Sequence, residues 1–205
     1  MTGDGGVAPV ATHGPLRLKR LALLARIRAD QVPVIVIEAP AGMGKSWLLA
    51  DLAGDMLVAR EDKPFAGARF WDVPAVALAG QLPDHPLILA KRPETAIPGL
   101  ARAEVYGRVS RYGTTDLLFT AEELGALRDA DAIMARSGGW PCLLPAAMSG
   151  KAVSAALITF LQDDLLTQIP SARLVAFQAY LTDPGAGYDA GLLTGLPFVG
   201  GKVLH

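Results

Sequence analysis

Residues 33–49, PVIVIEAPAGMGKSWLL, decide the fold of this chain. From Val32 to Ile37 the residues are apolar or β-branched, interrupted only by Pro33, and such a run predicts a short strand buried in a parallel sheet. A glycine-containing loop follows, and a helix is expected to begin near Lys45. The sequence therefore predicts an α/β fold in which helices flank a parallel sheet.

The loop at residues 39–46, APAGMGKS, fits the phosphate-binding pattern with alanine in place of its first glycine. Its two glycines would let successive backbone N–H groups point into one hollow, which the positive end of the next helix also faces. Lys45 is the candidate ligand of the β- and γ-phosphates, and Ser46 the candidate ligand of Mg²⁺. A glycine turn that precedes a lysine by chance is the alternative. The predicted nucleotide-binding residues of this stretch are Ala41, Gly42, Met43, Gly44, Lys45, Ser46 and Trp47.

Composition and charge limit the classes of protein to be considered. With 205 residues, of which 51% are hydrophobic, the chain can form one domain with a good core, or one domain with a small appendage. The net charge of −1 gives no reason to expect a surface that coats nucleic acid. The longest stretch without a charged residue, 137–150, is too short and too rich in glycine and proline to span a bilayer.

The ends and the cysteine content indicate a cytoplasmic location. Residues 1–14 contain no Lys or Arg and no long apolar segment, so they are unlike a signal peptide and are expected to form a flexible tail. Cys142 is the single cysteine, which excludes an internal disulfide bond. The three histidines are scattered and show no metal-ligand spacing.

A stretch of mixed basic and apolar residues precedes the predicted first strand. Residues 16–29 place Leu18, Leu21, Leu24 and Ile27 at roughly helical spacing. The basic residues between them would form a solvated helix face, which we favour, or lie near a nucleotide or an acidic partner. These basic residues are Arg17, Lys19, Arg20, Arg26 and Arg28.

Asp72 is a candidate metal ligand and, with Lys45, a candidate catalytic residue. The helix after the loop is expected to continue from 47 to 59, and the next predicted strand, 68–72, ends in Asp72. In nucleotide-binding α/β folds, a carboxylate at the end of a strand beside the phosphate-loop strand holds Mg²⁺ directly or through water. A helix N-cap ahead of Val73 is the alternative interpretation.

A clearer buried strand at residues 86–90 is followed by Lys91 and Arg92. Ligands bind outside the carboxyl ends of parallel strands, so a cation here could contact a terminal phosphate. An ordinary pair of loop cations is the alternative. A further strand is expected within residues 105–112 or 116–119.

Thr120 and Glu123 are spaced as a capping box, which predicts the start of a helix. Apolar residues within 124–133 give this helix an apolar face, and the glycine pair that follows ends it. Trp140 and Pro141 open the next element, where the residues alone predict a core position and a helix start.

Four segments in this order resemble the ATPase module of the STAND class, the signal transduction ATPases with numerous domains. They are most similar to the module of large, maltose-activator-like LuxR-type bacterial transcription activators, over roughly residues 16–181. The segments are APAGMGKS at 39–46, LILAKRP at 87–93, DLLFTAEEL at 116–124 and RSGGWP at 136–141.

The resemblance implies an α/β ATPase core followed by a helical region and a small winged-helix-like segment, with ATP as a switch ligand. It implies that Pro141, beside Trp140, lies against the adenine and that Arg92 is a sensor at the end of the fourth strand. The expected organisation is a tail at 1–14, a nucleotide-binding core at 15–120, a helical segment with the GGWP motif at 121–150, and a helical or winged-helix-like segment at 151–205.

The chain also departs from the family pattern. The segment between Leu48 and Asp72 is short for the family, so one strand and one helix of its sheet are expected to be missing. Asp72 has no acidic neighbour, which favours ATP binding over turnover, because hydrolysis needs a positioned base and water. The family's superhelical repeats and DNA-binding helix-turn-helix are not recognised, so no direct DNA binding is expected.

Three functions remain open. The first is a regulatory module in signal transduction or transcription that uses ATP or ADP with Mg²⁺ as a conformational switch, with slow or no hydrolysis; weak ATPase activity is left open. The second is a catalytically silent scaffold or antagonist. A protein partner or self-association, without a membrane, is expected for both. The third, a small-molecule phosphotransferase, ranks last because no acceptor base or arginine-rich lid is recognised.

Overall fold

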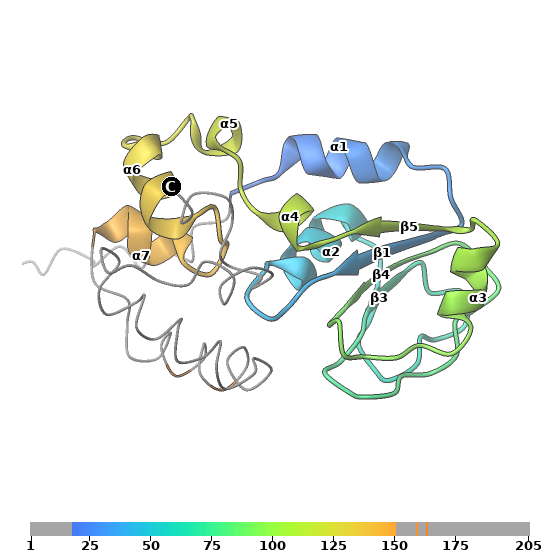
Figure 1. The fold of residues 1–205 in the computed structure, drawn as a ribbon. Helices are drawn as coiled ribbons and strands as arrows, with labels where there is room; N and C mark the ends of the chain where they lie inside the picture. Colours follow the sequence, from blue (N-terminus) through green and yellow to red (C-terminus); the bar gives the residue numbers. More distant parts are fainter. Residues whose placement is uncertain (1–17, 151–158, 160–162, 164–205) are drawn as a thin grey trace, which may run out of the picture.

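A computed structural model describes residues 18–150, 159 and 163 (Figure 1). The predicted tail and nearly all of the predicted segment 151–205 lie outside the described residues. The described core is a five-stranded sheet in the order β2-β3-β4-β1-β5, and every pairing in it is parallel. The strands are β1 Val34–Glu38, β2 Val58–Ala59, β3 Phe70–Asp72, β4 Leu87–Lys91 and β5 Val109–Tyr112.

The predicted first strand is the centre of this sheet. β1 lies between β4 and β5, and its residues 34–37 are each at most 5% exposed. Helices α1 (Leu21–Ala29) and α2 (Lys45–Ala53) cover one face. Helix α3 (Leu100–Val105) and the segments 60–69 and 73–86 cover the other face, and neither of these segments contains a helix. The prediction of an α/β fold with a parallel sheet is therefore confirmed.

The remaining helices lie beyond the carboxyl ends of the strands (Figure 1). They are α4 Thr114–Leu117, α5 Ala121–Leu124, α6 Ala130–Ser137 and α7 Leu144–Ser149. Helices α5 to α7 share a small apolar cluster of their own, which contains Phe119, Leu124, Ile133, Leu144 and Ala147. We call residues 118–149 the helical segment.

Several predicted boundaries are wrong for identifiable reasons. Helix α2 ends at Ala53, because Gly54 takes a positive φ of 57°, and the chain then forms β2 within the range predicted as helix. The capping box does begin α5, but Asp129 with a φ of 62° separates α5 from α6. Of the two alternatives for a further strand, the structure has β5, while 114–117 form α4. Between α2 and β3, where a strand and a helix are expected to be missing relative to the family, the chain forms the two-residue strand β2 and no helix.

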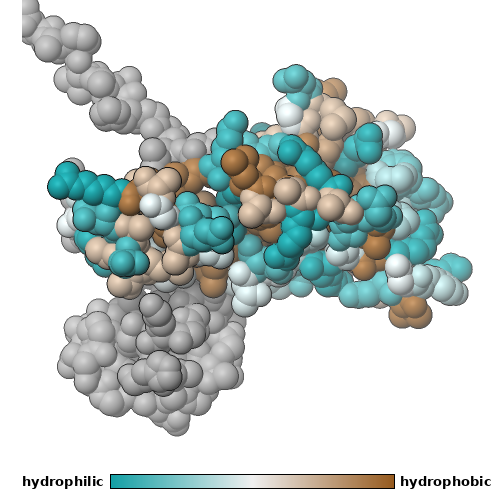
Figure 2. Space-filling view, turned by 90° about the horizontal axis from the view of Figure 1, so that it is seen from above, coloured by the Kyte–Doolittle hydropathy of each residue, from teal (hydrophilic) through white to brown (hydrophobic). Residues whose placement is uncertain are grey.

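Helix α1 begins at Leu21 rather than near residue 16. Its buried face includes Leu23 in place of the predicted Leu21. Leu23, Leu24 and Ile27 are buried, whereas Leu21 is 69% exposed. Figure 2 views the side of the molecule that carries α1, where hydrophilic residues are mixed with apolar ones. Within the described residues, no helix combines the length and hydropathy needed to cross a membrane.

Arg20 joins the start of α1 to the beginning of the helical segment. Its side chain is buried, and its guanidinium donates to the carbonyl oxygens of Leu117 at 2.6 Å and Leu118 at 2.7 Å. The same group forms two hydrogen bonds with the Glu123 carboxylate, at 3.0 and 2.9 Å, and lies 4.6 Å from the ring centroid of Phe119. The prediction of a solvated cation is therefore wrong for Arg20, although Arg26 and Arg28 are exposed.

Gly139 makes a second close contact between distant parts of the chain. The Phe119 amide donates to the Gly139 carbonyl at 2.7 Å, and a Cβ at Gly139 would lie 2.2 Å from the Phe119 carbonyl oxygen. Only glycine permits this approach together with its φ of +77°. The backbone just before Trp140 is therefore fixed against the segment that Arg20 holds.

We expect Gly139→Ala to lower the free energy of unfolding by about 3 kcal/mol, of which the left-handed backbone accounts for about 1–2 kcal/mol. Gly138→Ala is the matched control, because Gly138 also has a positive φ, of 58°, but a Cβ there would meet nothing within 4 Å. The control should therefore lose only the backbone contribution. Urea unfolding of both variants measures the difference, and equal losses would contradict the close approach.

Arg20→Met should destabilise the fold by about 3–5 kcal/mol, because it removes the guanidinium donor of three carbonyl groups and of the partly buried Glu123 carboxylate. Arg26→Met removes an exposed ion pair with Asp116 and should cost only about 0–1 kcal/mol. Thermal and urea unfolding distinguish the two. A similar small effect for both would show that Arg20 does not hold the helical segment.

Candidate functional site

The loop between β1 and α2 adopts the conformation that the glycine pattern predicts. Gly42 and Gly44 have positive φ values of 77° and 72°, and Gly44 directly precedes the nine-residue helix α2. Among the described residues, the backbone amides from Gly42 to Ser46 donate no hydrogen bond to another backbone group. These amides and the helix N-terminus form a hollow with the polarity that an anion requires.

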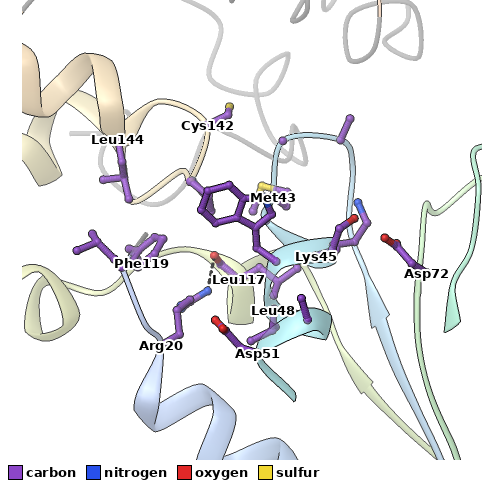
Figure 3. Close-up of a pocket in the computed structure, with 18 of the residues that line it drawn as sticks. Arg20, Met43, Lys45, Leu48, Asp51, Asp72, Leu117, Phe119, Cys142 and Leu144 are labelled. Atoms are coloured by element: carbon purple, nitrogen blue, oxygen red, sulfur yellow. Dashed lines mark hydrogen bonds between the residues drawn. The ribbon is translucent and has the colours of Figure 1, made fainter. Parts of the chain in front are cut away.

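This loop forms one wall of a cavity of about 1040 Å³ (Figure 3). The cavity is bordered by the residues that follow β1, β2, β3 and β4, and on the opposite side by the helical segment. All of the predicted site residues except Trp140 line it, namely Ala41, Gly42, Met43, Gly44, Lys45, Ser46, Trp47, Asp72, Arg92 and Pro141. The structure thus brings together residues from four separate sequence segments.

Lys45 is a cavity-lining cation whose charge is perturbed by its surroundings. Its ammonium donates to the Pro40 carbonyl at 2.7 Å, so the side chain folds over its own loop. Burial lowers the pKa of Lys45 to about 8, and the positive charge of Arg92 also lowers it, while Asp72 acts in the opposite direction. Figure 3 shows Lys45 and Asp72 pointing toward one another from different elements.

Asp72 ends β3 and lines the cavity, but β3 is not beside the strand that precedes the loop. β4 separates β3 from β1, so the predicted adjacency is wrong. The helix N-cap alternative is also wrong, because residues 73–75 form no helix and Val73 donates its amide to the Ala90 carbonyl at 2.9 Å. The described residues contain no group of three or more Asp, Glu, His or Cys suited to a metal ion. A metal held by Ser46 and Asp72 would therefore take its other ligands from water or a bound molecule.

The two cations after β4 have different surroundings. Arg92 lines the cavity, whereas Lys91 is only 5% exposed and is absent from the cavity wall. The Lys91 ammonium donates to Glu38 at 2.7 Å and to the carbonyls of Arg92 and Pro93 at 2.8 and 3.3 Å. Of the predicted pair, Arg92 alone is placed to meet a ligand.

Trp140 and Pro141 also have different surroundings. Trp140 is 5% exposed and belongs to the core beneath α1 and α2, as the residues alone predict. Pro141 lies in a turn rather than at a helix start, since α7 begins at Leu144. A Cβ at Gly44 would lie 3.6 Å from the Cβ of Pro141, so the proline ring packs directly against the loop.

Several lining residues were not identified from the sequence. Arg60 follows β2 and was missed because β2 lies within the range 47–59, which was predicted as helix. Asp51, on α2, also lines the cavity. The helical segment supplies an apolar wall in which burial raises the pKa of the Cys142 thiol to about 12. Only the three-dimensional contact with the loop identifies this wall, which includes Phe119, Cys142, Leu144, Pro145 and Met148.

Comparisons with known proteins place no family name on this site. Neither protein-family models nor curated protein sequences give a match to the chain.

Proposed function

We propose that the chain binds ATP or ADP with Mg²⁺ in this cavity and uses the nucleotide as a conformational switch, with slow or no hydrolysis. The observation that carries the proposal is the convergence of a glycine loop, whose amides donate to no backbone group among the described residues, with Lys45, Arg92 and Asp72 on one cavity at the carboxyl edge of a parallel sheet. In such sheets, ligands bind outside the carboxyl ends of the strands.

Charge supports an anionic ligand at the loop end of the cavity. The depressed pKa of Lys45 means that its charged form is destabilised by burial and by Arg92. A polyphosphate between the two cations would replace this repulsion with attraction and accept hydrogen bonds from the loop amides. In the proposed complex, Lys45 binds the β- and γ-phosphates, Arg92 the terminal phosphate, and Ser46 with Asp72 the Mg²⁺.

The opposite wall of the cavity favours the proposals that a nucleobase binds there and that the nucleotide acts as a conformational switch. Pro141 and the apolar residues of the helical segment offer a surface for a purine ring, as the family resemblance leads us to expect. A nucleotide that touches both the core and the helical segment would favour the arrangement in which both contacts are made. A role in signal transduction or transcription, through a protein partner and in the cytoplasm, remains part of this proposal.

Titration of the full chain with ATP and ADP by calorimetry, with and without Mg²⁺, tests the proposal. Lys45→Ala should weaken binding of both nucleotides at least about tenfold, because it removes a charge-assisted contact of roughly 1.5–3 kcal/mol. Lys63→Ala is the matched control, since Lys63 is exposed and does not line the cavity. Phosphate release is measured in the same samples.

The outcomes separate the candidate functions. Binding that depends on Lys45 with little phosphate release supports the switch, and rapid release would make the chain an ATPase and contradict slow turnover. A wild-type chain that binds neither nucleotide would reject the proposal and favour a silent scaffold that acts through a protein partner.

Nucleotide affinity should also depend on pH through Lys45. The polyphosphate binds the protonated amine and raises its pKa, so affinity should be nearly constant below about pH 8 and fall up to about tenfold per unit above it. Calorimetry at pH 8 in buffers of different ionisation enthalpy should reveal proton uptake on binding. Lys45→Ala should abolish this uptake, and uptake that persists in the variant would assign it to another group.

A further inference from the structure

The carboxyl edge of the sheet carries an ionic network with one buried member, and the nucleotide site does not use it. Glu38, the last residue of β1, accepts from Lys91 and from Arg111 of β5, each at 2.7 Å and at the same carboxylate oxygen. Arg111 continues to Glu104 of α3 through two hydrogen bonds at 2.7 and 2.9 Å. The network therefore joins the ends of β1, β4 and β5 to α3.

Lys91 is the buried member of this network, and all three of its N–H donors are used. One donor binds Glu38, and the other two bind the carbonyl oxygens of Arg92 and Pro93. A buried ammonium is tolerated only when it is paired in this way. Its charge thus fixes the backbone of the two residues that leave β4.

This backbone is the one that directs Arg92 to the cavity. The Arg92 carbonyl accepts from Lys91 and also from the Thr95 amide at 3.2 Å, which closes a turn immediately after the strand. Lys91 is 5% exposed beneath this turn, and Arg92 lines the cavity beside Lys45. Glu38 directly precedes the phosphate-loop segment. Its bond to Lys91 therefore fixes the position of Lys91 relative to the loop.

We propose that Lys91, anchored by Glu38, is a positioning residue that holds Arg92 where it distinguishes a nucleoside triphosphate from a diphosphate. The proposal rests on the proposed function, and it assigns to Lys91 no contact with the nucleotide. Its signature is a change in the ratio of ATP to ADP affinity rather than a general loss of binding.

The test compares this affinity ratio in the full chain and its variants by calorimetry with Mg²⁺. Arg92→Gln should reduce the preference for ATP about tenfold, which corresponds to about 1.4 kcal/mol. Lys91→Met keeps the length of the side chain but removes the three hydrogen bonds, and it should reduce the ratio to a similar degree. Affinity for ADP should change less than about threefold in both variants.

A double variant separates positioning from independent contact. If Lys91 acts through Arg92, the combination of Lys91→Met and Arg92→Gln should lose no more preference than Arg92→Gln alone. Arg111→Gln is the matched control, because Arg111 bonds the same Glu38 oxygen but none of the backbone at 92–93. It should leave the ratio unchanged. Additive losses in the double variant would overturn the proposal.

Two further measurements keep the test decisive if Lys91→Met fails to fold. Glu38→Gln retains an oxygen acceptor for Lys91 but removes its charge, so the ratio should fall part of the way. In the wild-type chain, ATP should slow hydrogen exchange of the Thr95 amide more than ADP does. An unchanged ratio in either folded variant, or equal protection by both nucleotides, overturns the role of Lys91. A wild-type chain that binds no nucleotide rejects the proposed function itself.

Discussion

The parallel pairing of β1 with β4 and β5 is the constraint on which the rest of the molecule depends. Its register places Glu38 opposite Lys91 and Ile37 opposite both Ala90 and Tyr112, so these strands end at one edge of the sheet. Side chains alternate between the two faces of a strand. A slip of β1 by one residue would therefore move each of its side chains from the apolar cluster on one face of the sheet to the cluster on the other face. The same slip would separate Glu38 from Lys91 and shift the loop relative to Arg92. The geometry of the candidate site is therefore inherited from the register of the sheet.

The helical segment meets this edge through contacts between residues far apart in the sequence. Arg20 binds the carbonyls that lead into the segment, and Gly139 lets the backbone before Pro141 pass close to Phe119. A guanidinium presents five donors in a fixed plane, so it can satisfy several carbonyls and both oxygens of a carboxylate at once. These two contacts place Pro141 against Gly44 and complete the cavity. The contacts that stabilise the fold are thus also the contacts that define the far wall of the site.

The sequence predicts the local parts of this structure better than their assembly. The apolar run at 34–37, the two loop glycines and the capping box at Thr120 follow from short-range rules, and all three are present. The end of α2 was missed because the apolar residues near β2 continue a helical pattern, although a glycine with positive φ ends the helix. The role of Arg20 was missed because its partners lie 96 to 103 residues away. Cations that alternate with apolar residues indicate a helix, but they do not reveal which of them is buried.

The arrangement of charge explains why binding without rapid turnover is the stronger proposal. Of the carboxylates that line the cavity, Asp51 lies on α2 and Asp72 ends β3, and Figure 3 shows the two on different sides of Lys45 and Leu48. Among the described residues that line the cavity, Asp72 thus has no second carboxylate beside it that could position a water for attack. Binding requires less, because the loop amides, Lys45 and Arg92 need only an anion between them. Burial and, to a smaller extent, the charge of Arg92 lower the pKa of Lys45, and a polyphosphate would offset both effects on the Lys45 charge, which a neutral ligand would not. This difference in free energy is what a nucleotide could use to favour one arrangement of the core and the helical segment over another.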